Sequence, residues 1–368
     1  MNQALNETEV KQCIGGVREP QIGRSLADLR MIKNVRGDAG SLTVELELPT
    51  PAYPGQPQLA QAVRSAIRGR FPQAPEPDVN FTWKVRGKDS GGSLGLHVRN
   101  VVAVGSGKGG VGKSTVAASI AYGLQHFGAK VGLMDADVYG PSIPHMLGVH
   151  ERPALTQIPG PEGKPINRIQ PIIADGLPVM SMGLFVKPDE AVVWRGPMLH
   201  GAITQFLKDT DWGELDYLII DLPPGTGDVT LTLSQLLGLA GAVVVCTPQD
   251  VALLDAVKAL KMFEKVKIPV LGVVENMSHF ECPHCHERTD IFGHGGAAKK
   301  AAELGVPFLG EIPINLQTRI NCDAGQLRDN FAADSVVRPY LLHIVEQTAL
   351  QIAKSLLEAP RMPTLEIL

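Results

Sequence analysis

The sequence is poor in several features that define common protein classes. It has 5 cysteines in 368 residues, an odd number and too few for a disulfide scaffold. Acidic residues outnumber basic residues by 38 to 34, so the formal net charge is −4 and no global basic field attracts nucleic acid. The amino terminus lacks a basic flank with an apolar run, and no stretch approaches the roughly 18 uninterrupted apolar residues of a membrane-spanning helix. We expect a cytoplasmic protein whose partners include neither nucleic acid nor a membrane.

The residues that are present predict a folded chain of two domains. Hydrophobic residues make up 44% and charged residues 20%, which excludes intrinsic disorder. Residues 41–48 and 79–85 alternate apolar with polar side chains, as strands with one buried face do, and helix periodicity lies between them. The polar, glycine-rich residues 86–96 suit a linker. We therefore predict a small α+β domain at residues 1–88, a linker at 89–98 and a second domain at 99–368.

Continuous apolar runs in the second domain predict strands that are covered on both faces. Segments with helix periodicity lie between several of these runs, which indicates βαβ crossovers and a parallel sheet. The predicted fold is a doubly wound, mostly parallel α/β sheet. Residues 151–178 are rich in proline and glycine, and we expect an irregular insertion or a short hairpin there. The apolar runs are residues 101–104, 130–134, 216–220, 242–246 and 270–274.

A phosphate-binding loop follows the first of these strands. Gly107, four further residues, Gly112, Lys113 and Ser114 have the spacing of a P-loop, and an amphipathic helix follows. In such a loop backbone amides surround phosphate oxygens, the lysine neutralises the β- and γ-phosphates, and the serine ligates Mg²⁺. Thr115 supplies a second hydroxyl. The predicted nucleotide contacts in the loop are Gly107, Lys108, Gly109, Gly110, Val111, Gly112, Lys113, Ser114 and Thr115.

Aspartates follow two further predicted strands at their carboxyl ends, where open α/β sheets bind ligands. Asp221 ends a strand and precedes Gly225, so we expect Asp221 to hold Mg²⁺ and Gly225 to offer a backbone amide near the γ-phosphate. Asp137 is the candidate for positioning the attacking water, with Asp135 near the metal. The alternative is that Asp135, Asp137 and Asp228 cap turns or helices, as aspartate often does. Asp137 and Asp221, with the loop lysine, are the predicted catalytic residues.

These motifs resemble a known family. GKGGVGKST, in which Lys108 follows the first glycine, resembles the deviant P-loop of MinD/ParA-type ATPases. DADVYGPS at 135–142, VVWRGPM at 192–198 and DLPPGTGD at 221–228 are similar to the Mrp (ApbC-like) iron–sulfur cluster carriers, and the amino-terminal domain resembles an iron–sulfur assembly domain. The resemblance implies an ATP-hydrolysing homodimer around two nucleotides. It adds Lys108 to the catalytic residues, reaching the partner's phosphates, and places Asn276 near the adenine base.

A pair of cysteines offers a metal site. Cys282 and Cys285 stand two residues apart, but a tetrahedral zinc or a four-iron cluster needs four protein ligands. A two-fold dimer brings two copies together and supplies four thiolates. The resemblance implies this arrangement, a [4Fe-4S] cluster that bridges two subunits and is held by Cys282 and Cys285 of each.

Two other interpretations of the cysteine pair remain open. A Cys2His2 zinc site can use imidazoles from the neighbouring His279, His284, His286 and His294. A dithiol redox pair is the other, although the pair does not open a helix in a thioredoxin-like βαβ pattern. Cys246 lies in an apolar strand and is expected to be a buried hydrophobe. Cys13 and Cys322 receive no role.

One departure from the family concerns the amino-terminal domain. Related domains often have a cysteine where this chain has Tyr53, which puts direct metal binding by residues 1–88 in doubt and favours docking or regulation. Tyr53 is expected to pack on the domain surface. Trp194 and Arg195 are either a partner hot spot or ordinary packing residues.

The function that the sequence favours is that of an ATP-dependent carrier. It binds a cluster at a dimer interface and transfers it from an assembly scaffold to recipient apoproteins. The alternative is a partitioning or regulatory ATPase of the MinD/ParA type with a structural zinc site. Because Pro360 and Pro363 interrupt the last residues and little positive charge is present there, no basic amphipathic helix for membrane recruitment is predicted.

Overall fold

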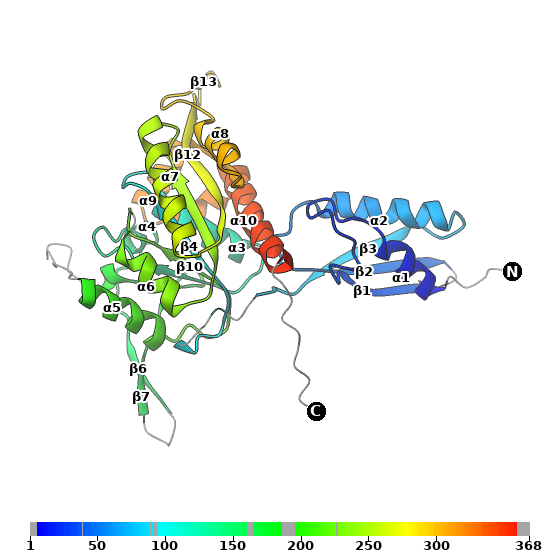
Figure 1. The fold of residues 1–368 in the computed structure, drawn as a ribbon, viewed down its shortest axis with the longest axis horizontal. Coiled ribbons are helices and arrows are strands. Elements are labelled where there is room, and N and C mark those ends of the chain that lie inside the picture. The colour runs from blue at the N-terminus through cyan, green and yellow to red at the C-terminus, as the bar shows by residue number, and fades with distance from the viewer. Residues whose placement is uncertain are drawn as a thin grey trace. The chain divides into compact units, whose positions relative to one another are not determined.

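The computed structural model describes residues 6–38, 40–87, 90, 94–159, 165–185, 196–225 and 227–358. The chain divides into two compact units (Figure 1). The smaller unit contains Met1–Arg86 and the stretch that begins at Ala349, and the larger unit is Gly87–Thr348. None of the described helices is both long and apolar enough to cross a bilayer.

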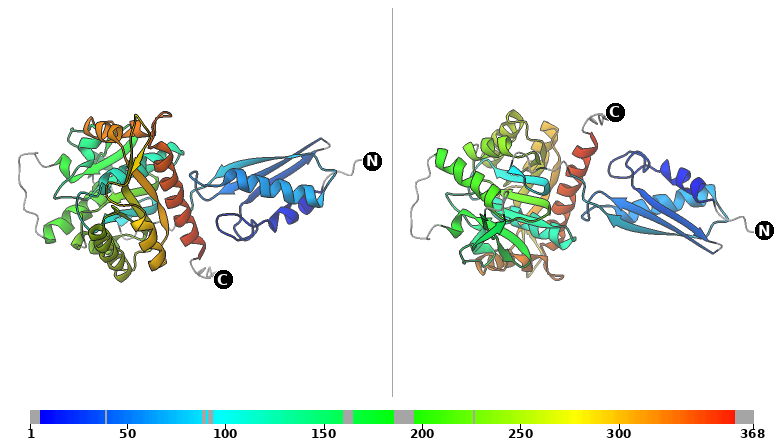
Figure 2. Two further views of the ribbon diagram at one scale, coloured as in Figure 1. Left: turned by 90° about the horizontal axis from the view of Figure 1, so that it is seen from above. Right: turned by 90° about the horizontal axis from the view of Figure 1, so that it is seen from below.

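The smaller unit is a three-stranded sheet covered by helices. Its strand order is β1-β2-β3, with β1 antiparallel and β3 parallel to β2. The predicted alternation is confirmed, because every second side chain of β2 is buried. Both helices pack on one face of the sheet (Figure 2). The elements are α1 (Glu7–Gly15), β1 (Ile32–Asp38), β2 (Ser41–Leu48), α2 (Gln56–Arg70) and β3 (Pro77–Trp83).

Tyr53 belongs to the core of this smaller unit. It is 2% exposed, so the expectation that it packs on the surface is wrong. Burial, together with the nearby Glu19 carboxylate, raises the pKa of its hydroxyl. Leu350, near the carboxyl end of the chain, contributes to the same core. The turn before α2 brings the ring inward, which alternation along a strand does not predict.

The larger unit is built on a nine-stranded sheet. The first elements are β4 (Val98–Ser106), α3 (Lys113–His126), β5 (Val131–Asp135), α4 (Ile143–Met146), β6 (Leu155–Pro159), β7 (Pro165–Ile169), β8 (Ile172–Ala174), β9 (Leu177–Ser181) and the 3-10 helix η3 (Met182–Leu184). The middle elements are α5 (Gly196–Asp209), β10 (Leu215–Asp221), α6 (Asp228–Leu236), β11 (Leu239–Cys246) and α7 (Asp250–Lys265). The last are β12 (Val270–Glu281), β13 (Arg288–Thr289), α8 (Gly296–Leu304), β14 (Phe308–Ile314), α9 (Leu316–Asp323), η4 (Leu327–Phe331) and α10 (Arg338–Glu358). The residues of α10 from Ala349 onward belong to the smaller unit.

The strand order of the sheet confirms the predicted doubly wound fold. The order is β13-β12-β11-β4-β10-β5-β9-β8, with β14 also paired to β12. The chain leaves β4 through α3 toward β5, and leaves β11 through α7 in the opposite direction toward β12. Because right-handed crossovers in opposite directions lie on opposite faces, α3 and α7 cover different sides of the sheet. Figure 1 shows α5, α6 and α7 together in front of the strands.

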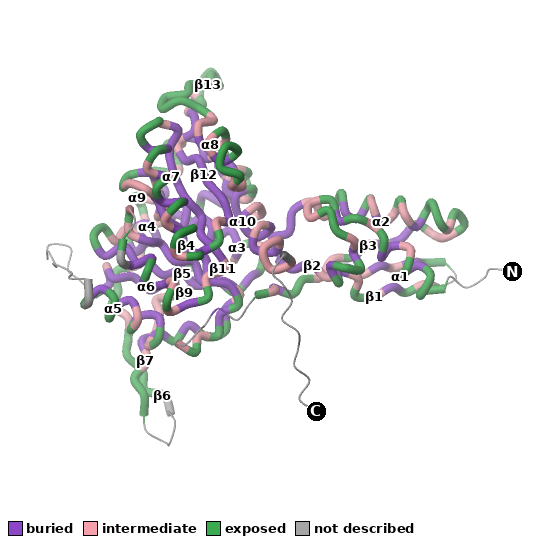
Figure 3. The backbone as a smooth tube through the Cα atoms, in the orientation of Figure 1, coloured by how far each residue is buried: buried purple, intermediate pink, exposed green. Residues whose placement is uncertain are grey.

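The proline-rich insertion contains the predicted hairpin. β6 and β7 pair antiparallel as a separate two-stranded ribbon. Figure 3 shows this ribbon as exposed backbone, in contrast to the buried central strands. Leu155 at its start is 71% exposed. Ile169, which ends β7, is 6% exposed and belongs to the core of the larger unit, whereas residues 155–157 and 165–167 of the hairpin are exposed.

Truncating a core side chain of β10 should destabilise the larger unit. Ile220 is fully buried, and Ile220→Ala is expected to lower the free energy of unfolding by about 2 to 5 kcal/mol. Ile173→Ala, at a position that is 59% exposed on β8, is the matched control and should cost less than about 1 kcal/mol. Denaturant unfolding followed by tryptophan fluorescence measures both, since Trp212 lies in the same core as Ile220. Equal losses for the two variants would contradict this account of the core.

Candidate nucleotide and thiol sites

The glycine-rich loop lies between the end of β4 and the start of α3. Gly110 and Gly112 have φ angles of +76° and +78°, a left-handed conformation that favours glycine. Gly107 is constrained by contact, because a Cβ atom there would lie 2.1 Å from the backbone carbonyl oxygen of Asp255 in α7. The loop is thus held on one side by α7. It continues directly into α3, whose first residue is Lys113.

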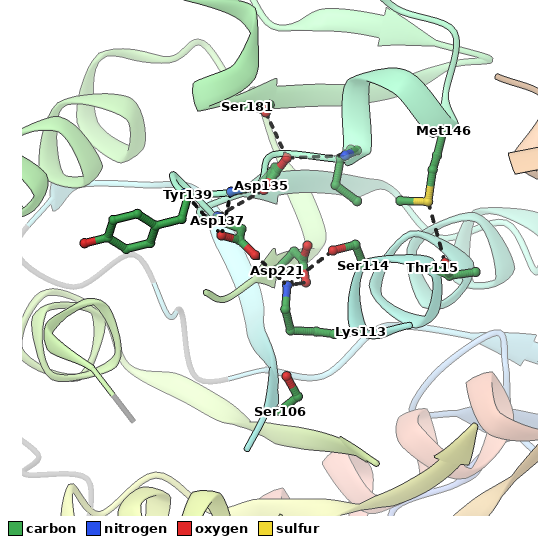
Figure 4. Close-up of polar contacts among 12 residues, drawn as sticks. Ser106, Lys113, Ser114, Thr115, Asp135, Asp137, Tyr139, Met146, Ser181 and Asp221 are labelled. Carbon is green, nitrogen blue, oxygen red and sulfur yellow. Dashed lines mark hydrogen bonds and ion pairs between the residues drawn. The ribbon is translucent and has the colours of Figure 1, made fainter. Parts of the chain in front are cut away.

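Lys113 points into a cluster of carboxylates (Figure 4). Its side chain is 6% exposed, and its Nζ lies 2.6 Å from Asp221 Oδ1 and 3.5 Å from Asp137 Oδ2. The same Nζ lies 3.3 Å from the Ser114 hydroxyl. The structure therefore brings together four residues that the sequence places in three separate motifs.

Asp221 and Asp135 end neighbouring parallel strands. They are partners in the register of β10 and β5, and both are fully buried. Burial and the charge of Asp221 raise the pKa of Asp135 to about 8. Burial also raises the pKa of Asp221, although Lys113 opposes this shift. Two carboxyl groups this close cannot both be ionised cheaply without a cation, and Lys113 supplies one.

Asp135 anchors the loop that carries Asp137. The Asp137 N–H donates to Asp135 Oδ1 at 3.0 Å, and the Ile143 N–H donates to Oδ2 at 3.4 Å. The hydroxyl of Ser181, which ends β9, also donates to Oδ2, at 2.9 Å. Ser181 was not among the predicted site residues, although a polar residue that ends an apolar strand is the same kind of signal as Asp135. These bonds suit Asp135 to holding the loop.

The Asp137 carboxylate caps a turn with one oxygen and faces Lys113 with the other. Its Oδ1 accepts the N–H groups of Tyr139 (3.3 Å) and Gly140 (3.2 Å), which closes a turn. Its Oδ2 faces Lys113 and is the oxygen available for a water or a substrate. Asp228, the other aspartate considered as a cap, is the first residue of α6, and its side chain lies outside the described residues.

The donor set beside Lys113 fits Mg²⁺. Asp221 Oδ2 is buried and has no hydrogen-bond partner within the described part of the chain. The Ser114 hydroxyl is a second oxygen near the same lysine. Mg²⁺ binds through one or two such oxygens together with water and phosphate, so an unsatisfied carboxylate oxygen next to a hydroxyl is the expected arrangement.

Two further predicted nucleotide contacts hold the loop in this structure. The Gly225 N–H donates to the Ser106 carbonyl oxygen at 2.9 Å, so a phosphate contact through this amide requires that bond to be exchanged. Asn276 is 8% exposed, and its Nδ2 donates to the Val111 carbonyl oxygen at 2.9 Å. Lys108 is half-buried at the outer side of the loop, where its carbonyl oxygen accepts the Ser106 hydroxyl.

The cysteine pair lies at the tip of the β12–β13 hairpin, at one end of the larger unit (Figure 1). The Cys282 N–H donates to the Glu287 carbonyl oxygen at 3.0 Å, and the His286 N–H donates to the Cys282 carbonyl oxygen at 2.9 Å. These two hydrogen bonds close the turn. Cys282 is half-buried and Cys285 exposed. The backbone N–H groups of Cys285 and His284 lower the pKa of Cys282, because they stabilise its thiolate. The hairpin therefore presents two adjacent thiols, one with raised thiolate character.

His286 and His279, two of the histidines near the pair, contact other groups. His286 Nδ1 lies 2.9 Å from Glu281 Oε1, and His279 is 4% exposed with its Nδ1 against the Ser278 hydroxyl. No ligand group that joins an imidazole to the two thiols occurs among the residues that the structure describes. The one-chain Cys2His2 zinc site therefore gains no support. Cys246 is 1% exposed, and burial raises its pKa to about 12, as suits the predicted buried hydrophobe.

Trp194 and Arg195, considered above as a hot spot or packing residues, lie outside the described residues, as does Thr226 next to Gly225.

Comparison with protein-family models gives two matches. Residues 97–349 match the family described as NUBPL iron-transfer P-loop NTPase, and residues 7–76 match a family described as iron–sulfur cluster assembly protein. These matches confirm the resemblance that the motifs indicated for both parts of the chain.

Curated relatives match nearly the whole chain. An iron–sulfur cluster carrier protein of Deinococcus radiodurans is 44% identical over 367 residues, which is 99% of this chain and 100% of that protein. A protein of the same description from Escherichia coli K12 is 41% identical over 88% of this chain and 87% of its own length. Among solved structures, a nucleotide-binding protein of Archaeoglobus fulgidus in complex with ADP is 42% identical, covers 63% of this chain and 89% of that chain, and has a TM-score of 0.54.

The buried Asp135 carboxyl should make stability depend on pH. An aspartate in an unfolded chain has a pKa near ~3.9, whereas burial beside Asp221 raises that of Asp135 to about 8. The folded protein therefore keeps a proton that the unfolded chain loses, and this group lowers stability as pH rises through that interval. In Asp135→Asn, which retains an acceptor for the Asp137 N–H, the free energy of unfolding should decline less steeply as pH rises. Urea unfolding of both proteins without nucleotide, from about pH 5 to about pH 8, measures the difference. If the free energy of unfolding depended on pH equally in both proteins, Asp135 would be ionised over the whole pH range.

Proposed function

This chain belongs to the NUBPL iron-transfer P-loop NTPase family, and from that premise we propose that it is an ATP-hydrolysing carrier of iron–sulfur clusters that delivers them to recipient apoproteins. The observation that carries the proposal is the combination of two sites in one unit. A buried lysine and two aspartates meet beside a glycine-rich loop, and an accessible pair of thiols lies on a hairpin of the same sheet.

The residues around Lys113 have distinct roles in phosphoryl transfer. When ATP binds, its phosphates compete with Asp221 and Asp137 for the Lys113 ammonium group, which then neutralises developing charge. Asp137 Oδ2 orients the attacking water, while the bonds from Tyr139 and Gly140 fix its carboxylate. Asp221 and Ser114 would hold Mg²⁺, which would neutralise negative charge on the phosphate oxygens. Half-buried Lys108 is available to reach the phosphates bound by a second copy.

A homodimer completes the cargo site. Each chain offers two neighbouring thiols, and a four-iron cluster is held by four. A two-fold axis near the hairpin tips supplies Cys282 and Cys285 from both copies. We therefore infer a bridging [4Fe-4S] cluster. Its exposed position suits transfer, since a recipient's thiolates can approach Cys285 directly.

β12 offers a physical connection between the nucleotide and the cargo. Asn276 on this strand donates to the P-loop at Val111, and the same strand ends at Glu281, directly before Cys282. Between them Met277 has a φ of +58°, which is unusual for a residue other than glycine, and the pairing with β14 shifts register there. A displacement of the P-loop on nucleotide binding can therefore move the cysteine hairpin, because the bulged segment of β12 connects the two directly along the chain.

The remaining assignments follow from the chemistry of the chain. All five cysteines are free thiols, which suits the reducing cytoplasm. Because Tyr53 is buried, the smaller unit is assigned to docking an assembly scaffold or recipient, or to regulation. The partitioning ATPase with a structural zinc site at the cysteine pair is not favoured, because no metal-ligand group in the described residues combines an imidazole with the two thiols.

Removing the loop lysine should abolish hydrolysis. Lys113→Ala deletes the cation that faces both aspartates, so ATP turnover at saturating ATP should fall by about a hundredfold or more. Phosphate release measures turnover, and circular dichroism verifies that the variant is folded. Lys258→Ala is the matched control, since that lysine is 73% exposed on α7 and pairs only with Asp255 in the described chain. Unchanged turnover in Lys113→Ala would refute the assignment of the phosphate site.

Removing one thiol of the hairpin should eliminate cluster retention while leaving ATP binding intact. Cys285→Ala leaves one thiol per chain and therefore two per dimer, too few for a four-iron cluster. Iron and acid-labile sulfide on anaerobically reconstituted protein should approach two of each per chain in the wild type and near zero in the variant. Cys322→Ala, which removes a thiol outside the hairpin, should retain the wild-type content. A full cluster on Cys285→Ala would exclude the bridging site.

A further inference from the structure

A second group of metal-ligating side chains lies below the cysteine hairpin. Glu275, His294 and Glu311 each offer a ligand atom, and these atoms all lie within 4.8 Å of one another. They come from three segments of the larger unit: β12, the turn before α8, and β14. None of them belongs to the nucleotide site or to the thiol pair. The larger unit thus brings together a group of oxygen and nitrogen donors that the sequence disperses over 37 positions, from 275 to 311.

The group is rich in negative charge. Glu275 and Glu311 are register partners on adjacent parallel strands, so two carboxylates lie side by side. Glu275 is fully buried and accepts the N–H groups of Gly295 (3.0 Å) and Ala297 (2.7 Å) at the start of α8. Neither glutamate forms an ion pair with a lysine or arginine in the described part of the chain. The N–H groups at the start of α8 compensate the negative charge of Glu275, whereas they do not contact Glu311.

Two imidazoles face the Glu311 carboxylate. His294 Nδ1 lies 3.5 Å from Glu311 Oε2, and His279 Nδ1 lies 3.9 Å from Oε1. The two imidazole rings are 6.5 Å apart and meet edge to face. His279 is 4% exposed, and its Nδ1 lies 2.8 Å from the Ser278 hydroxyl. Two carboxylates and two imidazoles therefore converge on one region.

Arg288 competes for this region. Its Nη2 lies 2.7 Å from His294 Nδ1, where it occupies the lone pair that a metal ion would use. The same side chain is 43% exposed, and its Nε donates to Asp290 Oδ1 at 3.1 Å. A metal ion can therefore displace the guanidinium from His294 while Arg288 keeps Asp290 as its partner.

We propose that Glu275, His294 and Glu311 bind a divalent first-row transition metal ion, with His279 as a further donor. Metal–ligand bonds of about 2.0 to 2.2 Å place neighbouring ligands about 3 to 4 Å apart, so rotamer adjustments bring the present separations into range. Mixed imidazole and carboxylate donors select zinc, ferrous or cobaltous ions over Mg²⁺ and Ca²⁺. Binding ties the base of the β12–β13 hairpin to β14 and α8. The site contains no thiol, so the proposal stands independently of the cluster-carrier function.

Cobalt titration of a protein without the hairpin thiols tests the site. We would use untagged full-length Cys282→Ser/Cys285→Ser protein under anaerobic conditions and follow the visible d–d bands of Co²⁺. One Co²⁺ per chain is expected, with the weak absorption of oxygen and nitrogen ligands and without thiolate charge-transfer bands. Displacement of the bound Co²⁺ by Zn²⁺ or by Fe²⁺ then shows which ion the site prefers.

Substitutions that are expected to weaken Co²⁺ binding, and one that is expected to strengthen it, make the test specific. In the same background, His294→Ala and Glu311→Gln should each weaken Co²⁺ binding by about tenfold or more. Arg288→Gln should tighten it, because it removes the competing cation. His286→Ala, on the same hairpin and paired with Glu281, is the matched control and should leave the affinity unchanged. Absence of stoichiometric Co²⁺, or an affinity that His294→Ala leaves unchanged, would overturn the proposal.

Discussion

The buried ion pair between Lys113 and Asp221 is the interaction on which the larger unit's chemistry depends. Their side chains are 6% and 0% exposed, and removing one partner of such a pair commonly costs about 3 to 5 kcal/mol because it leaves an uncompensated charge. The pair joins the first turn of α3 to the carboxyl end of β10. It therefore fixes the glycine-rich loop against the central strands, at the place proposed for phosphate, Mg²⁺ and the attacking water.

A second constraint is the close approach of backbones around the loop. Gly107 lies against the backbone of Asp255, and Gly112 against the amide of Asn276, so neither position has space for a side chain. These contacts place α7 and β12 directly behind the loop. β12 then continues to the cysteine hairpin, so the strand that contacts the glycine-rich loop also leads to the proposed cargo ligands. Carrier and hydrolase thus share one sheet, and no separate element is needed to connect them.

Much of the fold could be predicted from local patterns. Alternation identified β2 with its observed bounds, Ser41–Leu48, and the continuous apolar runs identified the central strands because both of their faces are covered. α1 and β1 were not predicted. Their apolar residues are few, and the charged and polar residues between them obscure any period. Tyr53 was expected on the surface, yet it is buried, because its environment is formed by segments distant along the chain.

The sequence by itself determined which chemical groups this protein has available. The P-loop spacing, the aspartates at strand ends and the cysteine pair are local patterns, and each can be interpreted chemically without knowledge of the tertiary structure. The tertiary structure alone decided which of these groups meet. Strand register placed Asp135 beside Asp221, and the end of β9 added Ser181 to them. The pairing of β12 with β14 placed Glu275 beside Glu311, and the turn before α8 added His294. The physical reason is that contacts between distant segments depend on the order and register of strands, and a periodic pattern fixes the burial of a residue without fixing its neighbour.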